Sequence, residues 1–247
     1  MADAVKSWWA KVLLVGAVIA AALLLIGALG SKFGLWGFQS GLLAVAAAIV
    51  MAAIGLLVGV VAIFVSRKRQ ITGDRPALLI SLGVSTLILA LMGVQFYQAS
   101  SVPAIHNIST DIEDPPQFDA VVALRGQDSN DLAYDGKTIG PLQQAAYPAV
   151  QSLMLPGTPG DALSAAIAAL EDMGLDIVAT NAAAGIVEAT ATTFWFGFKD
   201  DVVVRVRATG NGSVVDARSV SRVGVSDIGA NARRITQLLK RLQAQSG

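Results

Sequence analysis

Three long apolar stretches near the start of the chain constrain its fold more than any other feature. Val12 to Leu29, Leu42 to Val65 and Ala77 to Val94 hold 18, 24 and 18 residues without a charged side chain. A helix needs roughly 20 apolar residues to cross hydrocarbon. Their polar positions also lack the 3.6-residue stripe of an amphipathic soluble helix. The sequence therefore predicts three transmembrane helices at 12–29, 42–65 and 77–94, within a membrane domain of residues 1–98.

The first stretch has a second interpretation, a cleaved signal peptide, because Lys6 and Lys11 precede it. Its apolar run is longer than the usual h-region of about 7 to 15 residues, and no A-x-A cleavage site follows. The residues after it reach the same side of the membrane in either case.

The charges flanking the spans predict their direction. With three spans, the N-terminal tail and the second loop share one side, and the opposite short loop holds only Lys32. The positive-inside rule places the basic side in the cytoplasm, so everything after Val94 is expected outside, as in a multi-pass inner-membrane protein. The basic residues of the tail and the second loop are Lys6, Lys11, Arg67, Lys68, Arg69 and Arg75.

The spans themselves carry no ionisable side chain, which argues against a transport pathway or proton relay. Gly55 and Gly59 lie four residues apart, as do Ser81 and Ser85. Such spacing lets helix backbones approach closely. One interpretation is chance, because a Gly- and Ala-rich span often contains such spacing. The other is that these pairs fasten the three helices together or form a homo-oligomer through Gly55 and Gly59.

The remainder of the chain is acidic, with 11 basic and 16 acidic residues from position 102 onward. This balance argues against a nucleic-acid partner. Cysteine is absent from the whole chain, which excludes disulfides, thiolate nucleophiles and cysteine-based metal sites.

Patterning after residue 119 predicts one α+β domain of residues 119–247. Thr158, Pro159 and Asp161 open a helix that Gly174 closes. Four stretches follow with an apolar face and a charged face, like an antiparallel meander of about four strands. A last amphipathic helix begins near Asp227. The expected fold class is thus three transmembrane helices followed by an antiparallel sheet flanked by helices.

Four segments in this order resemble the domain of unknown function 1499 family, which occurs in bacterial and some plastid proteins. They read IHNISTDIEDPPQF, AAYPAVQSL, FWFGFKDDVVVRV and DARSVSRVGVSDIGANARRI, and the last is the most specific. The resemblance covers about residues 102–243 and leaves the membrane helices as an addition. It implies a domain boundary, and no activity comes with it.

The only histidine precedes three acids and a Pro-Pro pair, and this segment has three interpretations. His106, Asp111, Glu113 and Asp114 are weak candidates for a divalent metal site, because imidazole and carboxylate oxygen are suitable ligands. Their spacing fits no known metal-binding loop. The favoured interpretation is an extended spacer over 99–118, stiffened by the prolines. Contact with a partner is the third.

A polar cluster around the start of the last helix is the best candidate for binding an anion or ligand. A helix N-terminus offers free N–H groups and a positive dipole end, and arginines lie beside it. The alternative is structural, with Ser226 or Asp227 capping the helix and the arginines pairing with Asp200, Asp201 or Asp216. The candidates are Arg218, Ser221, Arg222, Ser226, Asp227, Asn231 and Arg234.

The segment TFWFGF offers Trp195 and Phe196 as candidates for apolar contact. Strand alternation would point Trp195 to one face and Phe194, Phe196 and Phe198 to the other, so one set fills the core. The other set is expected to pack under the irregular first third of the domain, or to meet a membrane interface or an apolar ligand.

Taken together, these patterns favour a non-enzymatic accessory or binding module that faces the periplasm from an inner-membrane anchor. The expected partners are the lipid bilayer and a membrane or periplasmic protein; no catalytic residue, cofactor or metal is assigned. The alternative is an envelope hydrolase or metal-dependent enzyme that uses the 218–234 cluster with His106 or an aspartate as base. Convergence of His106 or paired carboxylates with Arg218 and Arg222 in one cleft would favour the enzyme.

Overall fold

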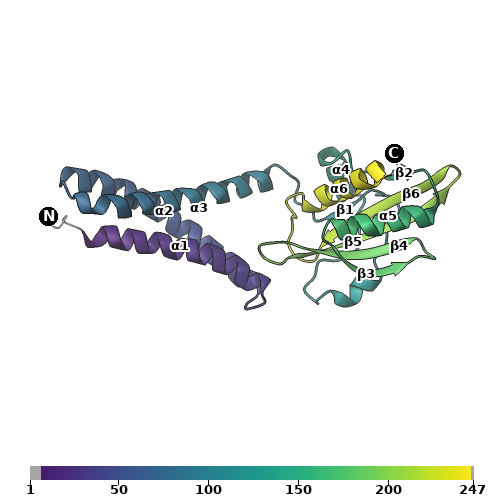
Figure 1. Cartoon of the computed structure of the whole chain (residues 1–247), viewed down its shortest axis with the longest axis horizontal. Helices are drawn as coiled ribbons and strands as arrows, with labels where there is room; N and C mark the ends of the chain where they lie inside the picture. The colour runs from purple at the N-terminus through teal and green to yellow at the C-terminus, as the bar shows by residue number, and fades with distance from the viewer. Residues whose placement is uncertain (1–6, 246–247) are drawn as a thin grey trace. The chain divides into compact units, whose positions relative to one another are not determined.

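The computed structural model describes residues 7–245 and divides them into two compact units. The first unit contains residues 7–98 together with the turn 194–197, and the second contains 99–193 and 198–245. Figure 1 follows the chain from the helices of the first unit into the mixed helices and strands of the second.

Three helices form the first unit: α1 (Trp8–Lys32), α2 (Phe38–Lys68) and α3 (Arg75–Ser100). The short 3-10 helix η1 (Thr72–Asp74) leads into α3. Each long helix encloses one predicted span, and each is long and apolar enough to cross a membrane. The three long apolar helices predicted from the sequence are therefore confirmed.

Small residues let these helices approach one another closely. A Cβ added to Gly27 of α1 would lie 2.9 Å from the carbonyl oxygen of Gly41 in α2. Gly55 and Gly59 of α2 face α3, where an added Cβ would lie 3.0 Å from the hydroxyl of Ser85 and 2.8 Å from Leu82. The glycine pair thus fastens α2 to α3 within one chain.

The second unit is built on a six-stranded antiparallel sheet rather than the four strands that patterning predicts. The strands are β1 (Asn107–Ser109), β2 (Leu153–Leu155), β3 (Asp176–Asn181), β4 (Ile186–Thr192), β5 (Lys199–Thr209) and β6 (Gly212–Ser221). Their order is β1-β6-β5-β4-β3, and β2 also pairs with β6. The two additional strands are only three residues long, too short to show a sequence period. Residues 107–109, expected to belong to the extended spacer, pair instead with β6.

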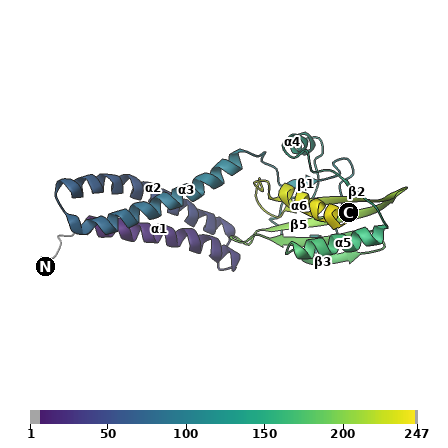
Figure 2. The same ribbon diagram turned by 45° about the horizontal axis from the view of Figure 1, so that its top comes forward.

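Two helices cover one face of this sheet, as Figures 1 and 2 show for α5 (Pro159–Asp172) and α6 (Ala230–Gln245). The predicted capping box of α5 is present, because the Thr158 hydroxyl accepts from the Asp161 N–H and the Asp161 carboxylate accepts in return. Gly174 follows with φ +76°, a conformation that suits glycine. Helix α6 begins three residues later than predicted, because Ile228 and Gly229 have positive φ.

The apolar core lies between these helices and the sheet. Valines and alanines that alternate along the strands, such as Val187, Val204 and Ala217, pack with Leu170 of α5 and Leu238 of α6. Fully burying each large side chain stabilises the domain by about 1.5–3 kcal/mol.

The opposite face of the sheet carries charged side chains and is covered by residues 110–135, the covering segment. This segment contains the 3-10 helix η2 (Ala120–Leu124) and precedes the short helix α4 (Ile139–Ala146). Hydrogen bonds and ion pairs hold it on the sheet, together with the buried side chains of Val121, Val203 and Val220.

Candidate functional site

Alternation along three strands gathers buried charges on the face beneath the covering segment. The register places Glu188 of β4, Val203 of β5 and Arg218 of β6 side by side, and Arg205 lies beside Asp216. Glu188, Asp216 and Arg218 are each at most 3% exposed. Buried charges are costly unless they are paired, so every one of them needs a partner.

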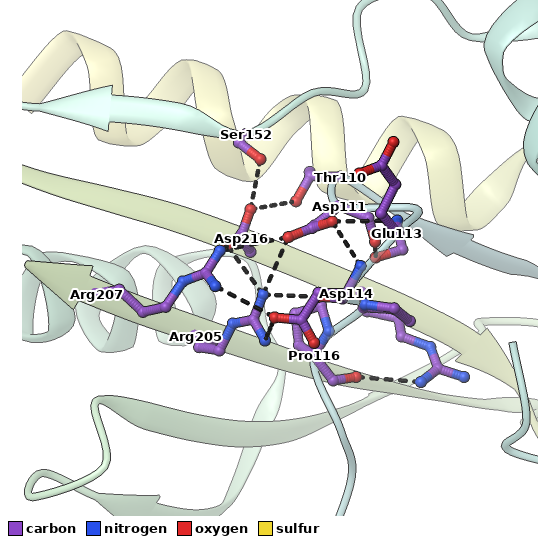
Figure 3. A network of polar contacts seen from close by, with 12 residues as sticks. Thr110, Asp111, Glu113, Asp114, Pro116, Ser152, Arg205, Arg207 and Asp216 are labelled. Atoms are coloured by element: carbon purple, nitrogen blue, oxygen red, sulfur yellow. Dashed lines mark hydrogen bonds and ion pairs between the residues drawn. The ribbon is translucent and has the colours of Figure 1, made fainter. Parts of the chain in front are cut away.

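The first group of partners centres on Asp216 and is drawn in Figure 3. One carboxylate oxygen of Asp216 accepts from Arg205 at 3.2 Å and from Arg207 at 2.8 Å. The other accepts from the hydroxyls of Ser152 and Thr110, at 2.5 and 3.4 Å. Arg205 and Arg207 lie on the neighbouring strand β5, whereas Ser152 and Thr110 lie outside the strands, so Asp216 joins the sheet to two segments beside it.

Both arginines also hold the start of the covering segment. Asp111 accepts from Arg205 at 3.2 Å and from Arg207 at 3.3 Å, and Asp114 accepts from the same two arginines at 3.0 and 3.2 Å. Three carboxylates therefore share two guanidinium groups. We call these five residues the Asp216 network.

Arg218 is the largest fully buried side chain of the domain and fixes the next part of the covering segment. Its guanidinium donates to the Asn107 side chain at 3.0 Å, to the Pro116 carbonyl at 3.1 Å and to the Leu132 carbonyl. The ring of Tyr134 lies 5.6 Å from it. Burial lowers the pKa of Arg218 to about 10 and raises the pKa of Tyr134 to about 12.

Asp201 and Glu188 hold the middle of the covering segment. Arg222 donates to both carboxylate oxygens of Asp201 at 2.8 and 3.0 Å, and Arg125 donates to it at 2.5 Å. The Glu188 carboxylate accepts from three consecutive backbone N–H groups, residues 119–121, at 3.0 Å each. These N–H groups begin η2, where a negative charge is favourable.

The helix-covered face holds the rest of the predicted polar cluster. Asn231 receives a hydrogen bond from Ser219 at 2.6 Å and donates to the Ser221 hydroxyl at 3.0 Å. Arg234 pairs with Asp200 at 2.6 Å. These groups fix the start of α6 on β5 and β6.

Asp227 caps this helix. Its carboxylate accepts from the N–H groups of Gly229 at 2.7 Å and Asn231 at 2.9 Å, and Ser226 accepts from the N–H of Ile228 at 3.2 Å. Burial is the main cause of a raised pKa at Asp227, and the nearby Asp200 adds to it.

The seven candidate residues of the cluster therefore fall into three groups. Arg218 and Arg222 lie on the charged face, and Ser221, Asn231 and Arg234 lie on the helix-covered face. Ser226 and Asp227 accept from backbone N–H groups at the start of α6. As the structural alternative predicts, Asp227 caps the helix, Arg222 pairs with Asp201 and Arg234 pairs with Asp200. Arg218 instead donates to two backbone carbonyls and to the side-chain amide of Asn107.

The His106 carbonyl accepts from the Asn231 side chain and from the N–H of Ser221, both at 3.0 Å, whereas its ring Nδ1 lies 3.2 Å from the Val225 carbonyl. Asp111 and Asp114 belong to the Asp216 network, and the carboxylate of Glu113 forms no ion pair with any residue in 7–245. Across that range no group of three or more acids and histidines is placed to hold a metal ion.

The aromatic segment forms a turn and not the end of a strand, which corrects the predicted alternation. β4 ends at Thr192, and residues 194–196 form the turn that leads to β5. Phe194 and Trp195 are both exposed, with ring centres 5.2 Å apart, and Phe196 is half-buried. Neither exposed ring belongs to the apolar core.

A groove of about 670 Å³ lies between α6 and residues 146–150, and sequence reasoning missed it. Its walls are largely apolar, and Arg233, Lys240 and Arg241 rise from α6 along it. The Tyr147 hydroxyl at its edge is buried, and it has no hydrogen-bond partner within the part of the chain that the structure describes. Its residues come from 146–150 and from α6, more than eighty positions apart, so no local sequence pattern predicts the groove. The groove is lined by Ala146, Tyr147, Pro148, Ala149, Val150, Ala232, Arg233, Thr236, Gln237, Lys240, Arg241 and Ala244.

Comparison with known families identifies the second unit. The family model described as "Protein of unknown function (DUF1499)" matches residues 107–242, more than half of the chain. The chain belongs to the DUF1499 family. The match begins at the first residue of β1 and ends within α6, so the DUF1499 region includes the whole sheet, the covering segment and every residue of the groove except Ala244. No curated protein matches the chain.

Proposed function

We propose that this DUF1499 protein is a non-enzymatic accessory module of the bacterial cell envelope, anchored by its three helices and recognising an acidic partner through the groove along α6. The unneutralised cations of that groove are the observation that carries the proposal. Within residues 7–245, neither Arg233 nor Lys240 forms an ion pair.

The direction of the spans supports an extracytoplasmic position for the domain. Six basic residues lie on the side of the N-terminal tail and one, Lys32, on the other. The positive-inside rule then keeps the tail in the cytoplasm and sends the DUF1499 domain to the periplasm.

The buried charged residues beneath the covering segment are committed to the fold, which disfavours the enzyme alternative. An acid–base mechanism needs a base within hydrogen-bond reach of a reacting group, in a cleft that admits substrate. Arg218 is 1% exposed, Asp201 is fully buried between Arg125 and Arg222, and His106 contacts a carbonyl instead of a carboxylate. Arg218 and Asp201 hold the covering segment in place, and the His106 ring faces the 222–229 loop.

The groove, by contrast, has the features of a recognition surface. Its volume lies within the range of about 300–1,000 Å³ usual for ligand sites, and its walls are mostly apolar with a few polar groups. The surrounding domain is acidic, whereas Arg233, Lys240 and Arg241 of α6 make the electrostatic potential along the groove locally positive. Such a field favours an acidic segment with an apolar side.

Charge reversal in the groove tests the proposal. The double variant Arg233→Glu, Lys240→Glu is compared with Lys137→Glu, which reverses an exposed charge outside the groove. Each protein is purified from mildly solubilised membranes and its co-purifying proteins are quantified. We expect a partner retained by the wild type and by Lys137→Glu to be lost from the double variant. Identical partner sets for all three proteins would overturn the proposal.

A further inference from the structure

A pocket of about 320 Å³ lies within the first unit, where α2 ends and α3 begins. Two cations line it: Arg67, in the last turn of α2, and Arg75, the first residue of α3. The pocket therefore combines positive charge with apolar surface at one end of two apolar helices. Its other lining residues are Ser66, Ile63, Leu78 and Leu79.

The charge of this pocket is not neutralised by the protein. Within residues 7–245, neither Arg67 nor Arg75 forms an ion pair, and both side chains are exposed. Residues 67–75 contain four cations and a single acid, Asp74. Asp74 is only 1% exposed, and its carboxylate oxygens accept from the N–H and the hydroxyl of Ser7 at 2.7 and 2.6 Å. The one nearby negative charge is thus committed to the start of α1.

Helix stability accounts for one of these arginines and not for the other. Arg67 lies at the negative end of the α2 dipole, where a cation is favourable. Arg75 lies at the positive end of the α3 dipole, where a cation is unfavourable. Because both arginines line one pocket, their charges also repel each other. An anion bound between them would offset both costs.

The apolar part of the pocket lies deeper along the same two helices. Ile63 precedes Arg67 by four residues, and Leu79 follows Arg75 by four, so each shares a helix face with its arginine. Four residues of helix span about 6 Å. Leu79 is 62% exposed, on a helix apolar enough to cross a membrane. The pocket thus has cations at the helix ends and aliphatic side chains about one turn inward.

We infer that this pocket binds an anionic phospholipid, with the phosphate between Arg67 and Arg75 and an acyl chain along Ile63 and Leu79. Guanidinium groups bind phosphate oxygens through short, charge-assisted hydrogen bonds. Basic pockets between membrane helices at the bilayer surface are suited to anionic lipid headgroups. A volume of about 320 Å³ has room for a headgroup, while the acyl chains remain in the bilayer.

The position of the pocket favours a lipid over a water-soluble anion. The loop between α2 and α3 lies at the same end of the first unit as the start of α1, as Figure 1 shows and the bond between Ser7 and Asp74 requires. That end is where apolar spans give way to charged residues, which is the depth of lipid phosphates. Reversing the direction of the spans would leave both arginines at one membrane surface, so the inference does not depend on their direction.

Native mass spectrometry of the full chain in mild detergent tests this inference. The protein is titrated with phosphatidylglycerol or with phosphatidylethanolamine of the same acyl chains, and inorganic phosphate is added as a competitor. The test variant is Arg67→Gln, Arg75→Gln. The matched control, Lys68→Gln, Arg69→Gln, removes two exposed charges from the same stretch but outside the pocket. All four side chains are exposed, so neither variant removes a buried contact.

We expect one phosphatidylglycerol to bind per chain, more tightly than phosphatidylethanolamine. Arg67→Gln, Arg75→Gln should weaken that binding about tenfold, because two exposed ion pairs with the phosphate are lost, whereas the control should bind like the wild type. Equal weakening by both double variants would overturn the inference, because general attraction to a positive surface would then explain the binding. Equal affinity for the two lipids, or displacement of phosphatidylglycerol by an equal concentration of inorganic phosphate, would also overturn it. The pocket lies in the first unit, so this result is independent of the groove along α6.

Discussion

The Asp216 network predicts a graded loss of stability when its three carboxylates are removed one at a time. The variants are Asp216→Ala, Asp111→Ala and Asp114→Ala. Their side chains are 0%, 19% and 67% exposed, although all three contact the same two arginines. Burial thus varies while the ion-pair partners stay constant.

The magnitude follows from that exposure. Removing one partner of a buried ion pair costs about 3–5 kcal/mol, because the remaining charge stays desolvated. An exposed pair contributes only about 0–1 kcal/mol. Asp216→Ala should therefore lower the free energy of unfolding by about 3 kcal/mol, Asp111→Ala by an intermediate amount, and Asp114→Ala by less than about 1 kcal/mol.

Urea unfolding of the full chain in detergent measures these differences in the free energy of unfolding. The readout is the fraction of the DUF1499 domain that a protease cleaves at each urea concentration, because the protease cleaves the unfolded domain. With a slope of about 2 kcal/mol per molar urea, Asp216→Ala should lower the midpoint by roughly 1.5 M. Glu113→Ala is the matched control, because this exposed neighbour forms no ion pair within residues 7–245. If Asp216→Ala unfolded at the same urea concentration as Glu113→Ala, the network would not hold the covering segment and the reasoning would be refuted.

Three further predictions concern single positions. Because burial raises the pKa of Asp227, the folded state binds more protons than the unfolded state between the ordinary and the raised pKa. Stability should fall as pH rises through that window, and Asp227→Asn should flatten this slope in urea midpoints measured across the acid range. Thr158→Ala removes the capping box of α5 and should cost about 1 kcal/mol in the same urea assay. Gly30→Leu should lower the thermal stability of the membrane helices in detergent, because an added Cβ would lie 2.0 Å from the Trp36 ring; Gly16→Leu, with nothing within 4 Å, should not.

Features set by neighbouring residues were predictable from the sequence. The capping box at Thr158 and the glycine that ends α5 depend on contacts three to five residues apart, and both were confirmed. The apolar spans depend only on composition along one helix. The alternation along β4, β5 and β6 likewise predicted a charged face.

Features set by distant residues were not predictable. Arg205 meets Asp114 across 91 positions and Arg218 meets Pro116 across 102, so no local period indicates that the covering segment closes the charged face. β1 was not predicted for the same reason, because its three residues form a strand only by pairing with the distant β6. Strand-like alternation predicted that Trp195 lies on a strand, whereas the chain turns there before β5 begins.

Site-specific photo-crosslinking from the groove tests the central claim most directly. A benzophenone side chain replaces Gln237 within the groove or Leu142 on α4 as an exposed control, and intact cells are irradiated. The account predicts an adduct of one discrete mass from position 237, none of that mass from 142, and its loss when Arg233 and Lys240 are changed to glutamate. No adduct from position 237, or an adduct that survives the charge reversal, would contradict recognition of an acidic partner along α6.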